Sequence, residues 1–141
     1  MTSFSFELED IDSAAKKLIE EAGSEKIWVF HGQMGAGKTT LIKSLAKQFK
    51  VIDQVSSPTF GLVNHYENSN GEIFYHFDFY RLERPEEALD IGIDEYFYST
   101  NICWLEWAEN IFPFLPDEYF LIRIDTLSET QRKITLEHIH A

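Results

Sequence analysis

The sequence has one cysteine, no long apolar stretch and little positive charge. Because Cys103 is the only cysteine, the chain cannot form an internal disulfide. No apolar run approaches the roughly 20 residues that a membrane-spanning helix needs. The opening residues, MTSFSFELED, also lack the basic and apolar regions of an export signal. We therefore expect a soluble protein of the reducing cytoplasm.

Acidic residues outnumber basic ones by 24 to 12, which gives a net charge of −12. Such a surface repels phosphate backbones, whereas proteins that bind nucleic acid on their own carry basic patches. If an RNA takes part in the function, we expect another subunit to hold it. A structural metal site is also disfavoured, because the five histidines are scattered and neither C-x-x-C nor H-E-x-x-H occurs.

The 141 residues suffice for one domain with a proper core, and no repeat or linker divides them. We therefore expect a single domain over residues 1–141. Hydrophobic periodicity and turn residues predict strands at 3–8, 26–32, 58–67, 72–80, 101–107, 118–127 and 132–140, and helical segments at 10–23, 38–49, 108–112 and from residue 84 to near Gly92. The strands at 58–80 and 118–140 form two hairpins in this prediction. The pattern indicates a mixed parallel and antiparallel α/β sheet flanked by helices.

A glycine-rich stretch, HGQMGAGKTT, joins the second predicted strand to the second helix. It fits the pattern G-x-x-x-x-G-K-[ST] with Gly32, Gly37, Lys38 and Thr39. Backbone amides of such a loop surround a phosphate, the helix start adds its positive dipole, and the lysine adds a charge. The nucleotide-binding residues predicted here are Gly32, Gln33, Met34, Gly35, Ala36, Gly37, Lys38, Thr39 and Thr40. The hydroxyl of Thr39 is also a predicted Mg²⁺ ligand.

Two carboxylates end apolar strands: Asp78 ends IFYHFD and Glu106 ends ICWLE. A nucleotide-bound Mg²⁺ normally needs an acid at the end of a neighbouring buried strand. Either acid alone could instead face solvent or cap a helix, but two of them beside a phosphate loop favour a functional role. Which of the two is nearer the metal stays open. The guanine-selecting motif N/T-K-x-D does not occur, so we expect ATP and Mg²⁺ as ligands.

Three further blocks make the sequence resemble the TsaE family of bacterial ATPases. They are SSPTFGLV at 56–63, HFDFYRL at 76–82 and WLEW at 104–107, in this order after the phosphate loop. The resemblance covers essentially the whole chain. It implies a P-loop NTPase fold with a mixed sheet and slow ATP hydrolysis by the isolated protein. It also implies activity within a complex with TsaD and TsaB, which makes threonylcarbamoyladenosine at position 37 of tRNA. We expect tRNA to be contacted through these partners.

The resemblance also assigns roles to individual residues. Lys38, Asp78 and Glu106 match catalytic positions, and Thr39 and Glu106 match the magnesium-binding pair. Thr59 lies in a segment similar to a switch loop that senses the γ-phosphate, and Arg132 matches a basic residue that approaches the nucleotide. Tyr80, Arg81 and Trp107 lie in blocks that matter for activity or partner contact, with individual roles left open.

Two other functions are compatible with a phosphate loop. A small-molecule kinase would close an arginine-rich lid over the γ-phosphate, and the chain has only four scattered arginines. A non-catalytic nucleotide sensor would bind ATP without hydrolysing it. The presence of Lys38, Thr39, Asp78 and Glu106 favours the ATPase over the sensor.

Overall fold

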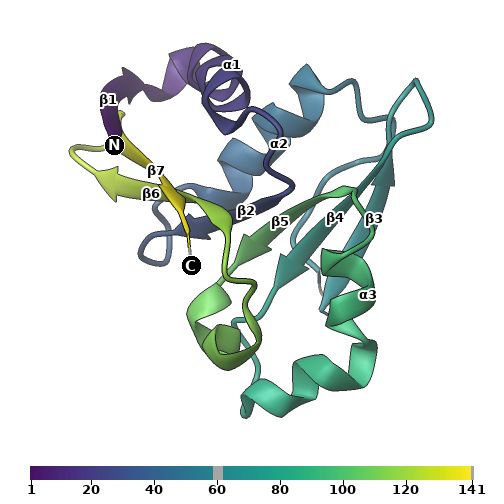
Figure 1. The fold of residues 1–141 in the computed structure, drawn as a ribbon. Coiled ribbons are helices and arrows are strands. Elements are labelled where there is room, and N and C mark those ends of the chain that lie inside the picture. Colours follow the sequence, from purple (N-terminus) through teal and green to yellow (C-terminus); the bar gives the residue numbers. More distant parts are fainter. Residues whose placement is uncertain (59–61, 141) are drawn as a thin grey trace.

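A single mixed sheet organises the chain in the computed structural model, which describes residues 1–58 and 62–140 (Figure 1). Within these residues the sheet has seven strands in the order β1-β7-β6-β2-β5-β4-β3. The strands are β1 (Thr2–Glu7), β2 (Ile27–His31), β3 (Val63–Glu67), β4 (Ile73–Asp78), β5 (Ile102–Glu106), β6 (Tyr119–Thr126) and β7 (Gln131–Ile139). The helical segments are η1 (Leu8–Asp10), α1 (Ile11–Ala22), α2 (Lys38–Gln48), η2 (Pro85–Ile91), α3 (Ile93–Phe97) and η3 (Ala108–Phe114).

The centre of the sheet is parallel and its margins are antiparallel. Strand β2 pairs in parallel with both β5 and β6, and β4 pairs in parallel with β5. The hairpins β3–β4 and β6–β7 and the pair β1–β7 are antiparallel. The carboxyl ends of β2, β4, β5 and β6 therefore meet at one edge, the usual place for a ligand site in such sheets.

Strand β2 is buried on both faces, and its alternating side chains enter two different cores. Trp28 and Phe30 pack with α1 and α2 on one face of the sheet. Ile27 and Val29 point the other way, into a core closed by η2, α3 and η3. A run of apolar residues with no polar alternation is what a central parallel strand requires. Helices thus cover both faces of the sheet (Figure 1).

The mixed α/β fold and both hairpins are confirmed, and the helical boundaries differ in two places. The short helix predicted to end near Gly92 is η2, and a further helix that the sequence did not predict, α3, follows it, because Gly92 adopts a left-handed conformation with a φ of 72° between them. Pro113 lies inside η3 instead of ending it, and the chain bends at Ile111. The strand predicted from residue 58 begins at Val63.

The acids at the start of α1 do not cap the helix. Asp10 occupies the N-cap position but makes no side-chain capping bond. The carboxylate of Asp12 accepts hydrogen bonds from Ser44 Oγ at 2.6 Å and from Lys47 Nζ at 2.7 Å, both on α2. These bonds fix α1 against the helix that follows the phosphate loop. Among the helices of the described residues, none is long and apolar enough to cross a membrane.

Candidate functional site

The predicted phosphate loop connects β2 to α2 in a shape that only glycine permits at several positions. Gly35 and Gly37 have φ values of 82° and 105°, in the left-handed region that costs other residues energy. Gly32 has a different constraint, because a Cβ atom there would lie 2.8 Å from the carbonyl oxygen of Ile124 on β6. The loop is therefore folded tightly against the neighbouring strand.

The first turn of α2 faces the space enclosed by this loop. Its N-cap residue is Gly37, which has no side chain with which to cap the helix amides. Uncapped amides and the positive end of the helix dipole make such a terminus a good site for an anion. The loop thus has the geometry that phosphate binding needs.

Lys38 is the cation of this loop, and it is almost fully buried at 6% exposure. Its Nζ donates a hydrogen bond of 2.6 Å to the carbonyl oxygen of Gly32 and lies 3.7 Å from the ring centroid of Trp107. Burial lowers the pKa of the Lys38 ammonium, and the nearby carboxylates of Glu106, Glu109 and Asp78 oppose this shift. The loop carbonyl and the indole face therefore hold the ammonium beside the cleft.

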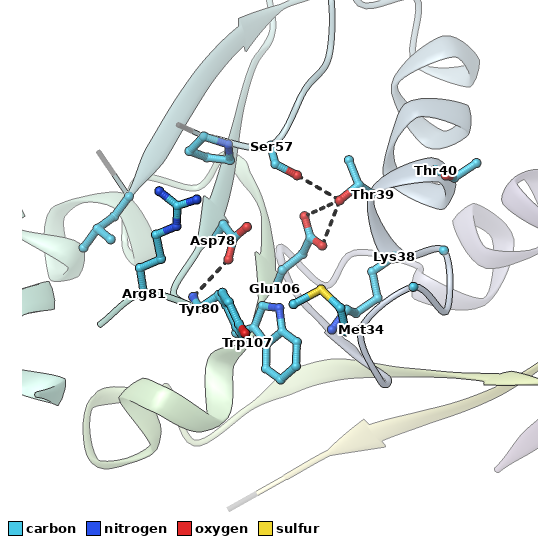
Figure 2. Close-up of a pocket in the computed structure, with 14 residues that line it drawn as sticks. Met34, Lys38, Thr39, Thr40, Ser57, Asp78, Tyr80, Arg81, Glu106 and Trp107 are labelled. Carbon is cyan, nitrogen blue, oxygen red and sulfur yellow. Dashed lines mark hydrogen bonds between the residues drawn. The ribbon is translucent and has the colours of Figure 1, made fainter. Parts of the chain in front are cut away.

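Glu106, at the end of β5, lies only 3% exposed next to Thr39. The Thr39 hydroxyl lies 3.0 Å and 3.1 Å from the two carboxylate oxygens, so its hydrogen is shared between them (Figure 2). Ser57 Oγ lies 3.0 Å from the same hydroxyl. Carboxylate and hydroxyl oxygens are hard ligands of the kind that Mg²⁺ prefers. Glu106 and Thr39 fit the magnesium-binding pair that the sequence predicts.

Asp78, at the end of β4, contributes the second carboxylate. Its Oδ1 accepts a 3.0 Å hydrogen bond from the backbone amide of Tyr80. Burial raises the pKa of the Asp78 carboxyl above its usual range, while this amide bond and nearby positive charge act in the opposite direction. A partly buried carboxyl with a raised pKa in a cleft is a candidate for proton transfer or for orienting water.

A cleft of about 510 Å³ brings most of the predicted residues together, a volume typical of small-ligand sites. The predicted residues that line it are Met34, Gly35, Gly37, Lys38, Thr39, Thr40, Asp78, Tyr80, Arg81, Glu106 and Trp107. In Figure 2 the side chains of Thr39, Glu106 and Asp78 point toward one another, while Lys38 and Met34 approach from the loop. Predicted residues from three separate stretches of sequence, 34–40, 78–81 and 106–107, thus form one site.

Trp107 forms part of the wall of this cleft and has an unusual backbone conformation. Its φ is 59°, in the left-handed region, directly after β5. Its ring packs against Tyr80 with centroids 4.9 Å apart and lies over Lys38. Backbone strain of this kind concentrates at functional sites, where the surrounding contacts maintain it.

Four described residues of the predicted ligand-binding set do not line the cleft: Gly32, Gln33, Ala36 and Arg132. Gln33 and Ala36 stabilise the loop from within, through a 3.0 Å bond from the Ala36 amide to the Gln33 carbonyl. Arg132 contacts the loop instead of lining the cleft: its Nε donates to the carbonyl oxygen of Ala36 at 3.0 Å. Thr59 lies outside the described residues.

The sequence interpretation missed two buried polar residues beside Glu106. His76 is fully buried, and its Nε2 lies 2.7 Å from Oε2 of Glu106. Its Nδ1 lies 3.0 Å from the hydroxyl of Tyr66 on β3. The signal for His76 was present in the sequence, because it precedes Asp78 by two residues on one strand and therefore shares its face. Tyr66 gave no such signal.

Comparisons with known proteins agree with this geometry. The family model described as threonylcarbamoyl adenosine biosynthesis protein TsaE matches residues 6–134. The chain belongs to the TsaE family. The TsaE protein of Bacillus subtilis is 36% identical over 127 residues, which cover 90% of this chain and 78% of the relative. The TsaE protein of Treponema pallidum is 36% identical over 121 residues, which cover 85% of each chain.

The fold is also similar to a solved crystal structure. The crystal structure of YdiB from Bacillus subtilis superposes with a TM-score of 0.73 at 28% sequence identity. The match covers 98% of this chain and 86% of YdiB. The TsaE resemblance drawn from the sequence blocks is therefore confirmed, together with the α/β fold.

Proposed function

We propose that this TsaE protein binds ATP with Mg²⁺ and hydrolyses it as one component of tRNA threonylcarbamoyladenosine biosynthesis. The observation that carries the proposal is the contact between Thr39, at the start of α2, and the buried carboxylate of Glu106. A carboxylate is costly to bury without a compensating partner. Placing it against the hydroxyl that follows the phosphate-loop lysine prepares an oxygen site for a cation.

To bind the triphosphate, the loop would replace hydrogen bonds within the protein by hydrogen bonds to the phosphate oxygens. Lys38 would leave the carbonyl oxygen of Gly32 for a phosphate oxygen, and the amides at the start of α2 would donate hydrogen bonds to the other phosphate oxygens. Thr39 and Glu106 would hold Mg²⁺, which when bound neutralises charge on the phosphate oxygens. Asp78, beside Glu106 at the carboxyl end of β4, would orient the attacking water.

Slow hydrolysis by the isolated chain and activity within an assembly belong to the same proposal. TsaD and TsaB are the proposed partners, and tRNA would be held by them, because the net charge of −12 disfavours direct binding to a phosphate backbone. The cytoplasm, where tRNA is modified, is the proposed location.

A thermal-shift experiment tests the nucleotide assignment. ATP with Mg²⁺ should raise the Tm of the wild-type protein, because a ligand that binds only the folded state stabilises it by mass action. GTP should raise it much less. Lys38→Ala should abolish the ATP effect, and Lys43→Ala, an exposed lysine on the same helix, should leave it intact. Equal shifts with ATP and GTP would reject the choice of adenine, and a full shift in Lys38→Ala would reject the loop as the site.

Phosphate release distinguishes the ATPase from a kinase and from a pure sensor. We expect slow release from ATP by the wild-type chain without any acceptor, and faster release when purified TsaD and TsaB are added. A kinase would transfer phosphate only with an acceptor present, and a sensor would release none under either condition. The affinity for the TsaD–TsaB pair should also depend on the nucleotide. Equal affinities with ATP, with ADP and without nucleotide would contradict a regulatory role for the site.

A further inference from the structure

The carboxylate of Glu106 belongs to a closed circuit of hydrogen bonds with two branches. One branch runs from Glu106 through the Thr39 hydroxyl to Ser57 Oγ, with contacts of 3.0 Å at each step. The other runs from Glu106 through His76 to the Tyr66 hydroxyl, which donates a 2.9 Å bond to the carbonyl oxygen of Ser56. Because Ser56 and Ser57 are neighbours in the chain, the peptide bond between them closes the circuit.

The two branches differ in their exposure to solvent and in how the binding of Mg²⁺ would affect them. Thr39 and Glu106 are the residues that would hold Mg²⁺, so the branch through Thr39 lies on the ligand side and would be rearranged. The branch through His76 lies behind the carboxylate, where His76 is 0% exposed and Tyr66 is 3% exposed. Neither His76 nor Tyr66 lines the cleft or belongs to the phosphate loop, so the hydrogen bonds between them and to Ser56 can persist when the ligand side changes.

We propose that His76 and Tyr66 are positioning residues that fix the carboxylate of Glu106 and tie it to the backbone at Ser56. His76 holds Oε2 from behind, which restricts the rotation of the carboxylate and keeps it directed at Thr39. Tyr66 holds His76 and binds the segment before the cleft at two points, accepting from the Ser56 amide at 3.3 Å and donating to its carbonyl. This inference rests on the magnesium site proposed above.

The circuit has a consequence for the order of the cleft wall. The segment containing Ser56 and Ser57 lies outside any helix or strand, and Asn64 adds a further 2.9 Å bond to the Ser56 carbonyl. Removing the Tyr66 hydroxyl therefore frees one side of this segment while the ring of Tyr66 stays in the core. The hydroxyl oxygen of Tyr66 therefore links the position of Glu106, through His76, to the position of the cleft segment at Ser56 and Ser57.

The test compares nucleotide affinity with Mg²⁺ and with EDTA in matched variants. His76→Ala should lose roughly 10-fold or more of the affinity gain that Mg²⁺ brings, because outer partners of metal ligands typically have effects of this size. Its affinity in EDTA should be unchanged. His76→Gln, whose amide can reach Oε2, should recover most of the gain. His65→Gln serves as the control, because His65 pairs with Tyr96 on the exposed side of β3.

Hydrogen exchange in the absence of nucleotide tests the link to Ser56 separately. Tyr66→Phe should speed exchange of the peptide over residues 54–58, because the Ser56 amide loses its acceptor. Tyr96→Phe, which removes an exposed hydroxyl, should not. If His76→Ala fails to fold, Tyr66→Phe decides alone through both measurements.

The outcomes separate this inference from the proposed function. No effect of Mg²⁺ on nucleotide affinity in the wild type would reject the proposed site, and the exchange measurement would still decide the link to Ser56. A wild type that responds to Mg²⁺, with His76→Ala and Tyr66→Phe responding equally, would overturn the positioning roles. Equal losses with Mg²⁺ and with EDTA would also overturn them, because general damage to the loop would then explain the effect.

Discussion

Asp78 and Glu106 are register partners at the carboxyl ends of the adjacent parallel strands β4 and β5. The two acids nevertheless have different surroundings. Glu106 is buried and reaches Thr39 and His76, whereas the shorter Asp78 stays partly exposed and binds the amide of Tyr80. One strand pairing thus places two carboxylates side by side and leaves them suited to different tasks.

The first prediction separates these tasks with two isosteric changes. Glu106→Gln removes a charge from the proposed magnesium-binding pair of Thr39 and Glu106, so nucleotide binding should respond less to Mg²⁺ and turnover should fall. Asp78→Asn should leave binding with Mg²⁺ nearly unchanged while turnover falls about 100-fold or more, the usual scale for losing a positioned proton-transfer group. Calorimetric binding and single-turnover hydrolysis measure the two effects. If the Asp78 variant lost its magnesium response and the Glu106 variant kept it, the roles would be exchanged.

The second prediction concerns the stability of the protein without nucleotide. Because burial raises the pKa of Asp78, the folded state keeps a proton at pH values where the unfolded chain has lost it. The contribution of Asp78 to stability therefore falls as the pH rises through this window. Asp78→Asn should have a higher Tm than the wild type at neutral pH. The difference should shrink as the pH falls toward and below the ordinary aspartate pKa of about 4.

Thermal unfolding at a series of pH values checks this prediction, with Asp94→Asn on the surface of α3 as the control. A Tm difference that grows on acidification would contradict it. Together with the first prediction, the result would show that Asp78 is retained at a cost to stability.

The third prediction addresses the tight packing of the phosphate loop against β6. In Gly32→Ala the new methyl group would lie 2.8 Å from the carbonyl oxygen of Ile124, a backbone atom that cannot rotate away. We expect a loss of about 1–3 kcal/mol in unfolding free energy, as for other overpacked sites, and a displaced loop that binds ATP weakly. Denaturant unfolding and ATP titration measure both, and a variant with wild-type stability would show that the loop has room to move.

The fourth prediction tests Arg132 as a support of the loop. Arg132→Ala removes the hydrogen bond from Nε to the carbonyl of Ala36. A typical hydrogen bond contributes about 0.5–1.5 kcal/mol, so ATP affinity should fall by roughly 2- to 10-fold. The loss should be equal with Mg²⁺ and with EDTA, because the contact lies away from the magnesium-binding pair. Arg123→Ala, an exposed arginine on β6, is the matched control, and equal affinities in the two variants would exclude the supporting role.

Much of this site could be predicted because its parts are local. The phosphate loop is a contiguous motif between a buried strand and an amphipathic helix, and the sequence reveals the strand as an unbroken apolar run and the helix through its hydrophobic period. The acids at the ends of β4 and β5 could be recognised in advance, because a nucleotide-bound Mg²⁺ normally needs a carboxylate at the end of a buried strand. Asp78 and Glu106 were therefore found from sequence.

The contacts behind the site could not be predicted, because they join residues that no local pattern connects. Periodicity reports which face of a strand is buried, but it does not report which strand lies next to it. The position of Tyr66 beside His76 depends on the register of β3 on β4. The contact of Arg132 with Ala36 depends on the β6–β7 hairpin lying beside β2. Both arise only when the sheet is assembled.

The order of the strands also bears on how the chain acquires its structure. Strand β1 is made first, yet it lies at the end of the sheet beside β7, with Thr2 opposite Leu136. Pairing these strands requires closing almost the entire chain into a loop, and contacts of such long range slow folding. During synthesis, β1 cannot pair within the sheet until β7 has been made. The β1 edge of the sheet can therefore form only after residues 131–139 have left the ribosome.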